Sequence, residues 1–362
     1  MTTPTIPTID LAALTGAPEQ AAEQARAVAS AFDQVGLVYL TNHGVSLERM
    51  HLLYDEYQRF TAEPLEKKER LSSGDIWYQR GWTPPNTERA VVAGGQPDFK
   101  ECYFAAPLES APEDALDYPE LYADNRWPAG YATFAELYLE LGRAVHRAGE
   151  ALLSLAALAL GEPADTFTRR IQGGPHVFRL LRYLPLSAEQ IEANVLWGEE
   201  HTDFNLLTLL PGGRFHGPTG ERAARPDDGS GLFLRAHPDA DHPKGQLIAG
   251  TPPPGCLVAQ VGQQLEILSG GRFHATPHII TAPRTPGYSR LSAAHFVHLH
   301  SREVLAPLPS CLTEASRRAY SPPVLAGTYS IKTLVDIGLA PPSALDQLGY
   351  RHYARLAEVR AD

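Results

Sequence analysis

The stretch HTDFNLLTLL, residues 201–210, places a histidine and an aspartate two positions apart at the start of an apolar run. Successive side chains of an extended chain point to opposite faces, so His201 and Asp203 share one face and can reach a single metal ion. An H-x-D triplet alone says little, because most such triplets lie on protein surfaces. Its meaning depends on which other ligands the chain supplies.

A third ligand follows in Thr276-Pro277-His278, which opens the apolar run Ile279-Ile280-Thr281. Two histidines and one carboxylate form the facial triad that binds iron(II) and leaves positions open for a co-substrate and dioxygen. His274 has the same strand parity as His278, but four extended residues span ~13 Å, so both cannot bind one iron. The place of His278 directly before an apolar strand favours it over His274.

An arginine and a serine, Arg290 and Ser292, lie on one strand face beyond His278. A guanidinium group can bind a carboxylate through two hydrogen bonds, and a serine hydroxyl can add another. The pair therefore predicts an anion grip close to the metal site.

The pattern of the whole chain predicts a central β structure wrapped by helices, within one domain. Short β-rich runs separated by Gly and Pro are typical of a barrel or jelly roll. They fall at Val177–Tyr183, Thr208–Leu210, Leu232–Leu234, Gln246–Ile248, Gly255–Val261, Pro277–Thr281 and Ser289–Leu299, with earlier strands at Ile6–Leu11 and Gly36–Thr41. Helices are expected at Pro18–Gln34, Ser46–Phe60, Phe134–Leu160 and Ala344–Leu356, and a long loop at residues 72–98.

The remaining histidines of the C-terminal half are not expected to bind the metal. We expect exposed loop positions for His216, His237 and His242, and packing or surface positions for His295, His298 and His300.

Composition narrows the class of protein. The 362 residues carry a formal charge of −11, which disfavours binding to nucleic acid or to an anionic membrane surface. No apolar run reaches the ~18 residues of a membrane span, and the N-terminus lacks the order of a signal peptide. The three cysteines form no CxxC pair, which fits reduced thiols in the cytoplasm. We expect a cytoplasmic monomer or small homo-oligomer.

The sequence resembles the isopenicillin N synthase-like family of iron(II)/2-oxoglutarate-dependent oxygenases over nearly its full length. The matching segments occur in the family's order: IPTIDL at 6–11, GLVYLTNHGV at 36–45, PLEKK at 64–68, PDFKE at 97–101, HTDFNLLTLL at 201–210, VGQQLEILSGGRFHATPH at 261–278 and RLSAAHF at 290–296. This resemblance implies an α+β fold, in which a distorted double-stranded β-helix (jelly roll) is wrapped by N-terminal and C-terminal helices. Residues 1–362 would form a single catalytic unit. It would consist of an N-terminal oxygenase-type region at 6–125, the iron and 2-oxoglutarate core at 175–300, and a C-terminal helical tail at 301–362.

The resemblance also implies the cofactors and the reaction. Fe(II) would bind to His201, Asp203 and His278. The distal (C5) carboxylate of 2-oxoglutarate would bind to Arg290 and Ser292, with help from Tyr183. With O2, such an enzyme oxidises a small-molecule substrate, most often by hydroxylation, and releases succinate and CO2.

The substrate residues are much less determined by the sequence. The family builds this wall from N-terminal loops and from strands near the metal, which points to Tyr78, Arg80, Trp82, Phe204 and Phe296. An aromatic and arginine cluster suits an aromatic or anionic substrate.

Three positions depart from the family pattern. Gln263 replaces an aspartate, Ile279 replaces a basic residue, and Leu181 stands where an asparagine is common. These departures affect the surroundings of the triad and leave its three ligands in place.

Two alternative functions remain open at this point. One is an iron oxidase or ethylene-forming type of enzyme with the same fold, which does not couple 2-oxoglutarate to a separate hydroxylation substrate. The other is a non-catalytic jelly-roll binding protein.

Overall fold

The computed structural model describes residues 5–88, 97–110, 112–226, 229–238 and 242–348. Its centre is a large sheet in the order β1-β2-β12-β7-β14-β5-β4-β3, with β8 added beside β14 and β9 beside β8. The strands span Thr8–Asp10 (β1), Leu37–Thr41 (β2), Leu257–Val261 (β12), Leu207–Leu210 (β7), Ser289–Val297 (β14), Val177–Tyr183 (β5), Lys100–Ala105 (β4), Gly81–Thr83 (β3), Gly213–His216 (β8) and Arg222–Ala223 (β9).

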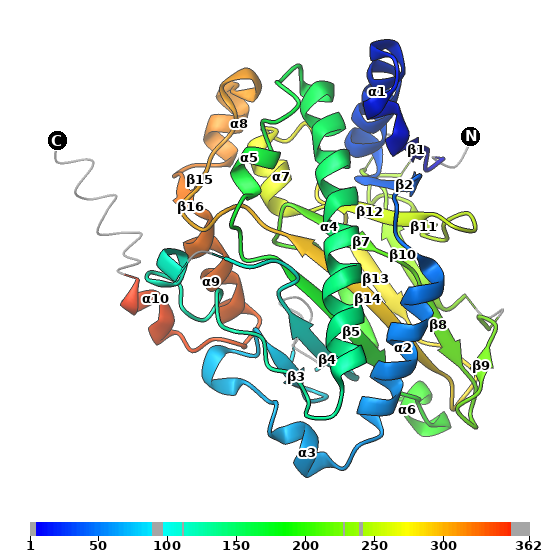
Figure 1. The fold of residues 1–362 in the computed structure, drawn as a ribbon. Helices are drawn as coiled ribbons and strands as arrows, with labels where there is room; N and C mark the ends of the chain where they lie inside the picture. Colours follow the sequence, from blue (N-terminus) through cyan, green and yellow to red (C-terminus); the bar gives the residue numbers. More distant parts are fainter. Residues whose placement is uncertain (1–4, 89–96, 111, 227–228, 239–241, 349–362) are drawn as a thin grey trace.

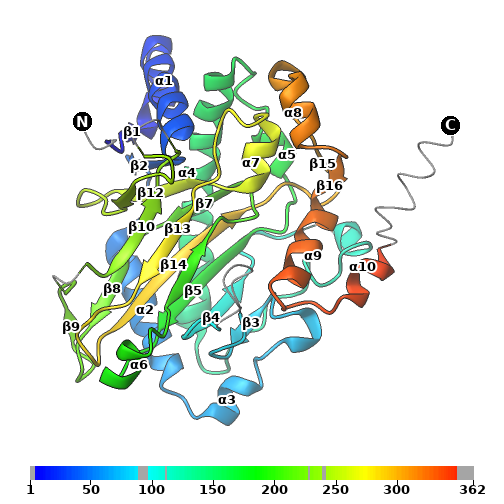
Figure 2. The same cartoon turned by 180° about the vertical axis from the view of Figure 1, so that it is seen from behind.

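A second sheet in the order β11-β10-β13-β6 lies behind the first one when the molecule is viewed as in Figure 1, and in front of it in Figure 2. Its strands span Leu247–Ala249 (β11), Gly231–Arg235 (β10), His278–Thr281 (β13) and Gly198–His201 (β6). Side chains of both sheets share one apolar cluster, in which Ile280 of β13 packs with Leu181, Phe215 and Phe296 of the large sheet. Two facing sheets that are antiparallel apart from the β1–β2 pair are the architecture of a jelly roll, so the predicted fold class is confirmed.

Three helices cover the outer face of the large sheet: α1 (Pro18–Gln34), α2 (Leu47–Thr61) and α4 (Ala132–Leu160). Apolar side chains of α4 recur at helical spacing and join the main core with β14 and β7. Gly161 ends α4 with a left-handed φ of 80°, a conformation that glycine adopts without steric cost. The predicted helices at 18–34 and 134–160 are therefore confirmed.

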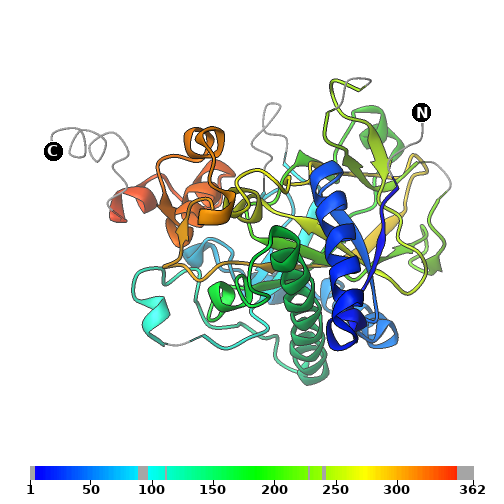
Figure 3. The ribbon, with the colours of Figure 1, turned by 90° about the horizontal axis from the view of Figure 1, so that it is seen from above.

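The other helices are short. They span Leu65–Glu69 (α3), Thr168–Ile171 (α5), Ala188–Glu192 (α6), Gln263–Leu268 (α7), Glu314–Ala319 (α8), Ala326–Asp336 (α9) and Ser343–Gln347 (α10), and a two-stranded ribbon pairs Val304–Leu305 (β15) with Val324–Leu325 (β16). Figure 3 shows the C-terminal elements, in orange and red, gathered at the end of the molecule away from α1. Among the described residues, no helix is both long enough and apolar enough to cross a bilayer.

Several local predictions were wrong. The expected loop at 72–98 contains β3 and a short 3-10 helix, because three extended residues are enough to pair with β4. His216, expected on an exposed loop, is 2% exposed and pairs with Ser289 as part of β8. This strand was not predicted because the Gly and Pro residues that flank it are typical of a loop. Of the helix expected at Ala344–Leu356, only the first part coincides with α10, and residues 349–362 lie outside the described residues.

Tyr138 ties α4 to the sheet. Its buried hydroxyl lies within hydrogen-bonding distance of the carbonyl oxygens of Tyr103 on β4 and Phe178 on β5. We expect Tyr138→Phe to lower the free energy of unfolding by roughly 1 kcal/mol, the usual net value of one buried hydrogen bond. Urea unfolding would measure this as a lower midpoint with an unchanged slope, and an unchanged midpoint would contradict it.

Candidate metal centre

Three predicted ligands meet where the second sheet faces the large one. His201 ends β6, Asp203 follows it, and His278 opens β13 directly opposite His201 in the strand register. One ligand atom from each of the three side chains lies within 4.8 Å of the other two, and Nε2 of His201 is 3.6 Å from Oδ1 of Asp203. Among the described residues, this is the only group of three or more His, Cys, Asp or Glu side chains that can hold a metal ion.

Backbone carbonyls fix which nitrogen of each histidine faces the metal position. Nδ1 of His201 lies 2.7 Å from the carbonyl oxygen of Glu199, and Nδ1 of His278 lies 3.0 Å from that of Thr276. A carbonyl oxygen only accepts, so each Nδ1 carries the hydrogen and each Nε2 keeps its lone pair. Both histidines are thereby prepared as metal ligands.

The protonation states also suit a divalent metal. Burial lowers the pKa of His278 to about 4, so its imidazole is neutral near pH 7. Burial alone would raise the pKa of Asp203, but the neighbouring His278 and His201 and the hydrogen bonds from Thr208 and Gln260 outweigh it and hold that pKa below its ordinary value. Two imidazoles and one carboxylate are the donor set of the iron(II) facial triad, so the residues present fit iron.

His274, the competing ligand, lies elsewhere. Its ring stacks on His237 with centroids 3.9 Å apart, and its Nε2 is 3.9 Å from a carboxylate oxygen of Asp33 on α1. His237 is exposed, as expected. The structure therefore selects His278.

We expect His278→Ala to abolish metal binding and iron-dependent turnover, because it removes one of three ligands. His274→Ala is the matched control and should keep both properties. Metal content after reconstitution, together with oxygen consumption, measures the two variants. The ligand assignment is wrong if His274→Ala loses metal binding and turnover while His278→Ala keeps them.

The predicted anion grip is assembled by pairing between strands. Arg290 and Ser292 lie on one face of β14, and Tyr183 of β5 is the direct cross-strand partner of Arg290. The guanidinium carbon of Arg290 is 5.6 Å from the ring centre of Tyr183 and 5.9 Å from that of Phe215. Ser292 and Tyr183 are each 5% exposed, so a carboxylate bound here would be shielded from water.

Gly213 of β8 makes room for this arginine. A Cβ atom at position 213 would lie 2.7 Å from Nε and from Nη2 of Arg290, closer than real Cβ contacts allow. We expect Gly213→Ala to displace the guanidinium and raise the KM for 2-oxoglutarate roughly tenfold, equal to about 1.4 kcal/mol of lost binding, with metal affinity unchanged. A normal KM would show that Arg290 does not need this space.

Two residues expected in the substrate wall serve the fold instead. Arg80 is 2% exposed and donates to the backbone carbonyls of Gln79, Leu121 and Ala123. A buried guanidinium needs such acceptors, and this requirement cannot be read from a loop sequence. Trp82 is 1% exposed within the main core, and its indole N–H donates to Glu101. The expectation that these two side chains contact substrate is therefore not supported.

The other three wall residues are partly exposed. Phe204 follows the ligand Asp203, Phe296 lies on the inner face of β14, and Tyr78 adopts a left-handed φ of 59° beside Gly74. His298, which was expected to pack or to lie at the surface, packs against Phe204 with ring centres 5.4 Å apart. Burial lowers the pKa of His298 to about 3, so it is a neutral group close to the ligand carboxylate.

Sequence reasoning missed a buried charge cluster on the inner face of the large sheet. Lys100 and Arg179 share the carboxylate of Glu88, and Lys100 also pairs with Asp98. Lys100 is the cross-strand partner of Tyr183, which places the cluster beside the grip. The two cations hold the pKa of Glu88 at about 2 despite its burial. Strand parity was the available signal, since Arg179 and Tyr183 lie on the same face of β5.

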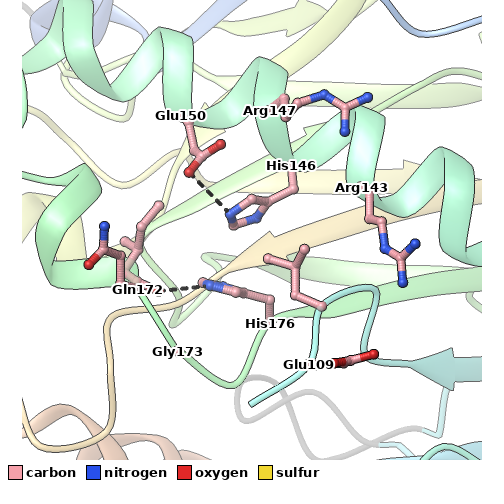
Figure 4. Close-up of a pocket in the computed structure, with 10 residues that line it drawn as sticks. Glu109, Arg143, His146, Arg147, Glu150, Gln172, Gly173 and His176 are labelled. Atoms are coloured by element: carbon pink, nitrogen blue, oxygen red, sulfur yellow. Dashed lines mark hydrogen bonds and ion pairs between the residues drawn. The ribbon is translucent and has the colours of Figure 1, made fainter. Parts of the chain in front are cut away.

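The pocket in Figure 4 is separate from the metal centre. Its volume is about 350 Å³, and it lies between α4 and the segment that follows α5, on the outer side of the large sheet. His146 and His176 form its buried floor, and Arg143, Arg147 and Glu150 stand around it. Nδ1 of His146 lies 3.0 Å from Nε2 of His295, so the fully buried His295 has a hydrogen-bonding partner.

Comparison with known proteins gives two family matches that together cover most of the chain. The family described as non-haem dioxygenase in morphine synthesis, N-terminal, matches residues 6–130, and the 2OG-Fe(II) oxygenase superfamily matches residues 176–299. The chain belongs to this superfamily. It is a 2-oxoglutarate- and iron(II)-dependent dioxygenase, an oxidoreductase whose iron ligands are His201, Asp203 and His278.

Individual relatives agree with this assignment. The chain is 27% identical to the 2-oxoglutarate-dependent dioxygenase ecdK of Aspergillus rugulosus, over 78% of this chain and 84% of that protein. It is also 27% identical to homoarginine-6-hydroxylase 2-ODD-233 of Oryza sativa subsp. japonica, over 83% and 85% of the two chains. The crystal structure of a 2OG-Fe(II) oxygenase family protein from Caulobacter crescentus has the same fold, with a TM-score of 0.72, 25% identity and coverage of 92% of this chain and 100% of that one.

Proposed function

We propose that this dioxygenase hydroxylates a carbon atom of a small molecule. One oxygen atom of O2 enters the substrate as a hydroxyl group and the other enters succinate, while 2-oxoglutarate loses CO2. Two electrons come from the substrate C–H bond and two from the decarboxylation, so no further reductant is needed. A relative that carries the name of a hydroxylase supports this choice over the other outcomes of the same oxidation.

The observation that carries the proposal is the position of the grip relative to the triad. Arg290 and Ser292 lie on β14, and the same strand pairs with β7, whose Thr208 donates to the ligand Asp203. In the proposed complex, Arg290, Ser292 and Tyr183 hold the C5 carboxylate of 2-oxoglutarate and direct its other end to the metal. Iron(II) on the triad supplies the oxidation chemistry, and the protein supplies orientation and exclusion of water.

We assign the substrate to the side of the triad that Phe204, Phe296 and His298 border, with Tyr78 a further contact. The two phenylalanine rings offer flat apolar surfaces. His298 is a neutral imidazole, and its Nδ1 has no hydrogen-bond partner among the described residues. Such a lining fits an aromatic or cyclic substrate that carries a hydrogen-bonding group.

The division of the chain into regions is part of the same proposal. We assign residues 1–362 to one catalytic unit, with an N-terminal oxygenase-type region at 6–125, the catalytic core at 175–300 and a helical tail at 301–362. We also propose a cytoplasmic monomer or small homo-oligomer. The thiols of Cys102, Cys256 and Cys311 support a reducing compartment, since all three are free.

The decisive measurement is the amount of succinate formed per O2 consumed, in a screen of candidate substrates with a control that lacks substrate. We expect a ratio of one to one, with one hydroxylated product for each succinate in the presence of the right substrate. Turnover without succinate would refute 2-oxoglutarate coupling and favour the iron oxidase. Ethylene formed without a hydroxylated product would favour the ethylene-forming reaction.

Arg290→Ala tests the grip. The variant should need on the order of a hundredfold more 2-oxoglutarate for half-maximal turnover, because a charge-assisted pair of hydrogen bonds is lost. Iron affinity should stay unchanged, since the arginine does not contact the ligands. Equal losses of iron and 2-oxoglutarate binding would indicate misfolding of the centre.

A further inference from the structure

The two carboxylate oxygens of Asp203 have different surroundings. Oδ2 accepts a hydrogen bond of 2.6 Å from the hydroxyl of Thr208 and another of 2.8 Å from Nε2 of Gln260. Oδ1 faces Nε2 of His201 at 3.6 Å. Two donors occupy the two lone pairs of Oδ2, so Oδ1 is the oxygen left for a metal.

Both donors come from one cross-strand pair. Thr208 of β7 and Gln260 of β12 are direct partners in the large sheet, and each is 1% exposed. The ionised carboxylate only accepts, so the Thr208 hydroxyl donates its single hydrogen to Asp203, and Nδ2 of Asn205 donates to the Thr208 oxygen at 3.1 Å. The direction of the Thr208 bond is therefore set by the carboxylate itself.

Gln260 contacts two of the three metal ligands. Besides its bond to Asp203, its Nε2 lies 3.3 Å from both ring nitrogens of His278. Its Oε1 is buried without a hydrogen-bond partner among the described residues. A buried acceptor without a partner costs stability, and the neighbours Ala259 and Val261 show that this strand otherwise carries apolar side chains.

We propose that Gln260 and Thr208 are positioning residues that occupy Oδ2 of Asp203 and so reserve Oδ1 for the metal. The pair sets the orientation of the carboxylate before the metal arrives. Because β12 and β7 belong to the large sheet and the two histidines lie on the second sheet, the pair also keeps the carboxylate in register with ligands from the opposite sheet. Neither residue is expected to contact 2-oxoglutarate.

The test is binding of cobalt(II), a redox-stable probe, to the apoprotein. Calorimetry measures the affinity, and the visible spectrum of the bound ion reports its coordination. Thr208→Val and Gln260→Met each remove one donor with little change in size. We expect each to weaken cobalt(II) binding at least about tenfold, the lower end of the usual effect of losing a hydrogen bond to a metal ligand. The visible bands should shift as well, because the carboxylate becomes free to rotate.

Three further variants separate positioning from a purely structural role. Thr208→Ser keeps the hydroxyl and should restore near-normal affinity and spectrum. Gln260→Asn keeps the amide but shortens the side chain by one methylene group, and should behave like Gln260→Met. Gln264→Met is the matched control, because Gln264 is equally buried but accepts from the backbone of Leu299 instead of contacting a ligand. It should lower thermal stability and leave cobalt(II) binding unchanged.

The proposal is overturned if Thr208→Val and Gln260→Met bind cobalt(II) with wild-type affinity and an unchanged spectrum, even if they unfold at lower temperature. It is also overturned if Gln264→Met weakens cobalt(II) binding as much as Thr208→Val and Gln260→Met do, since the loss of affinity would then follow from general destabilisation. If Gln260→Met fails to fold, the comparison of Thr208→Ser with Thr208→Val decides.

Discussion

The pairing of β6 with β13 is the constraint on which the site depends. It sets His201 directly opposite His278. The register of the two strands shifts between this pair and the next one, Ile280 with Gly198. Bulges of this kind re-aim side chains next to functional sites. A slip of one residue would turn the two imidazoles to opposite faces and leave the metal with a single histidine.

The large sheet supplies the complementary half of the centre. Its inner face carries the polar side chains of Arg290, Ser292, Tyr183, Thr208 and Gln260, while its outer face packs against α4 through apolar side chains. Strand alternation alone achieves this division, because neighbours along one strand point to opposite sides. β14 is central to it, since it pairs with β5, β7 and β8 and so joins the grip to the residues around the metal.

Buried charge is concentrated next to the grip. Lys100, Arg179 and Glu88 form ion pairs that are costly to bury and that a purely apolar packing would avoid. These charges lie beside Tyr183, which belongs to the apolar cluster around Leu181 and Trp197. The inner face of the sheet is therefore more polar than this cluster alone would indicate. The inner face of the large sheet therefore combines aromatic side chains with buried charges that come from segments far apart in the sequence.

The sequence by itself determined the fold class, the long helices and the ligands His201 and Asp203, and it favoured His278 as the third ligand, because these follow from local periodicity and from residue types at fixed spacing. HxD on one strand, a histidine opening another and RxS on a third needed no tertiary information. Short strands such as β8 were missed, since four residues between glycines give no periodic signal, and His216 was misplaced with them. Only the tertiary structure decided between His274 and His278, showed that Arg80 and Trp82 are buried, and brought Gln260 and Thr208 to Asp203. In each case the reason is physical: strand parity gives the face of a side chain, but which other strand lies opposite depends on the pairing of segments dozens of residues apart.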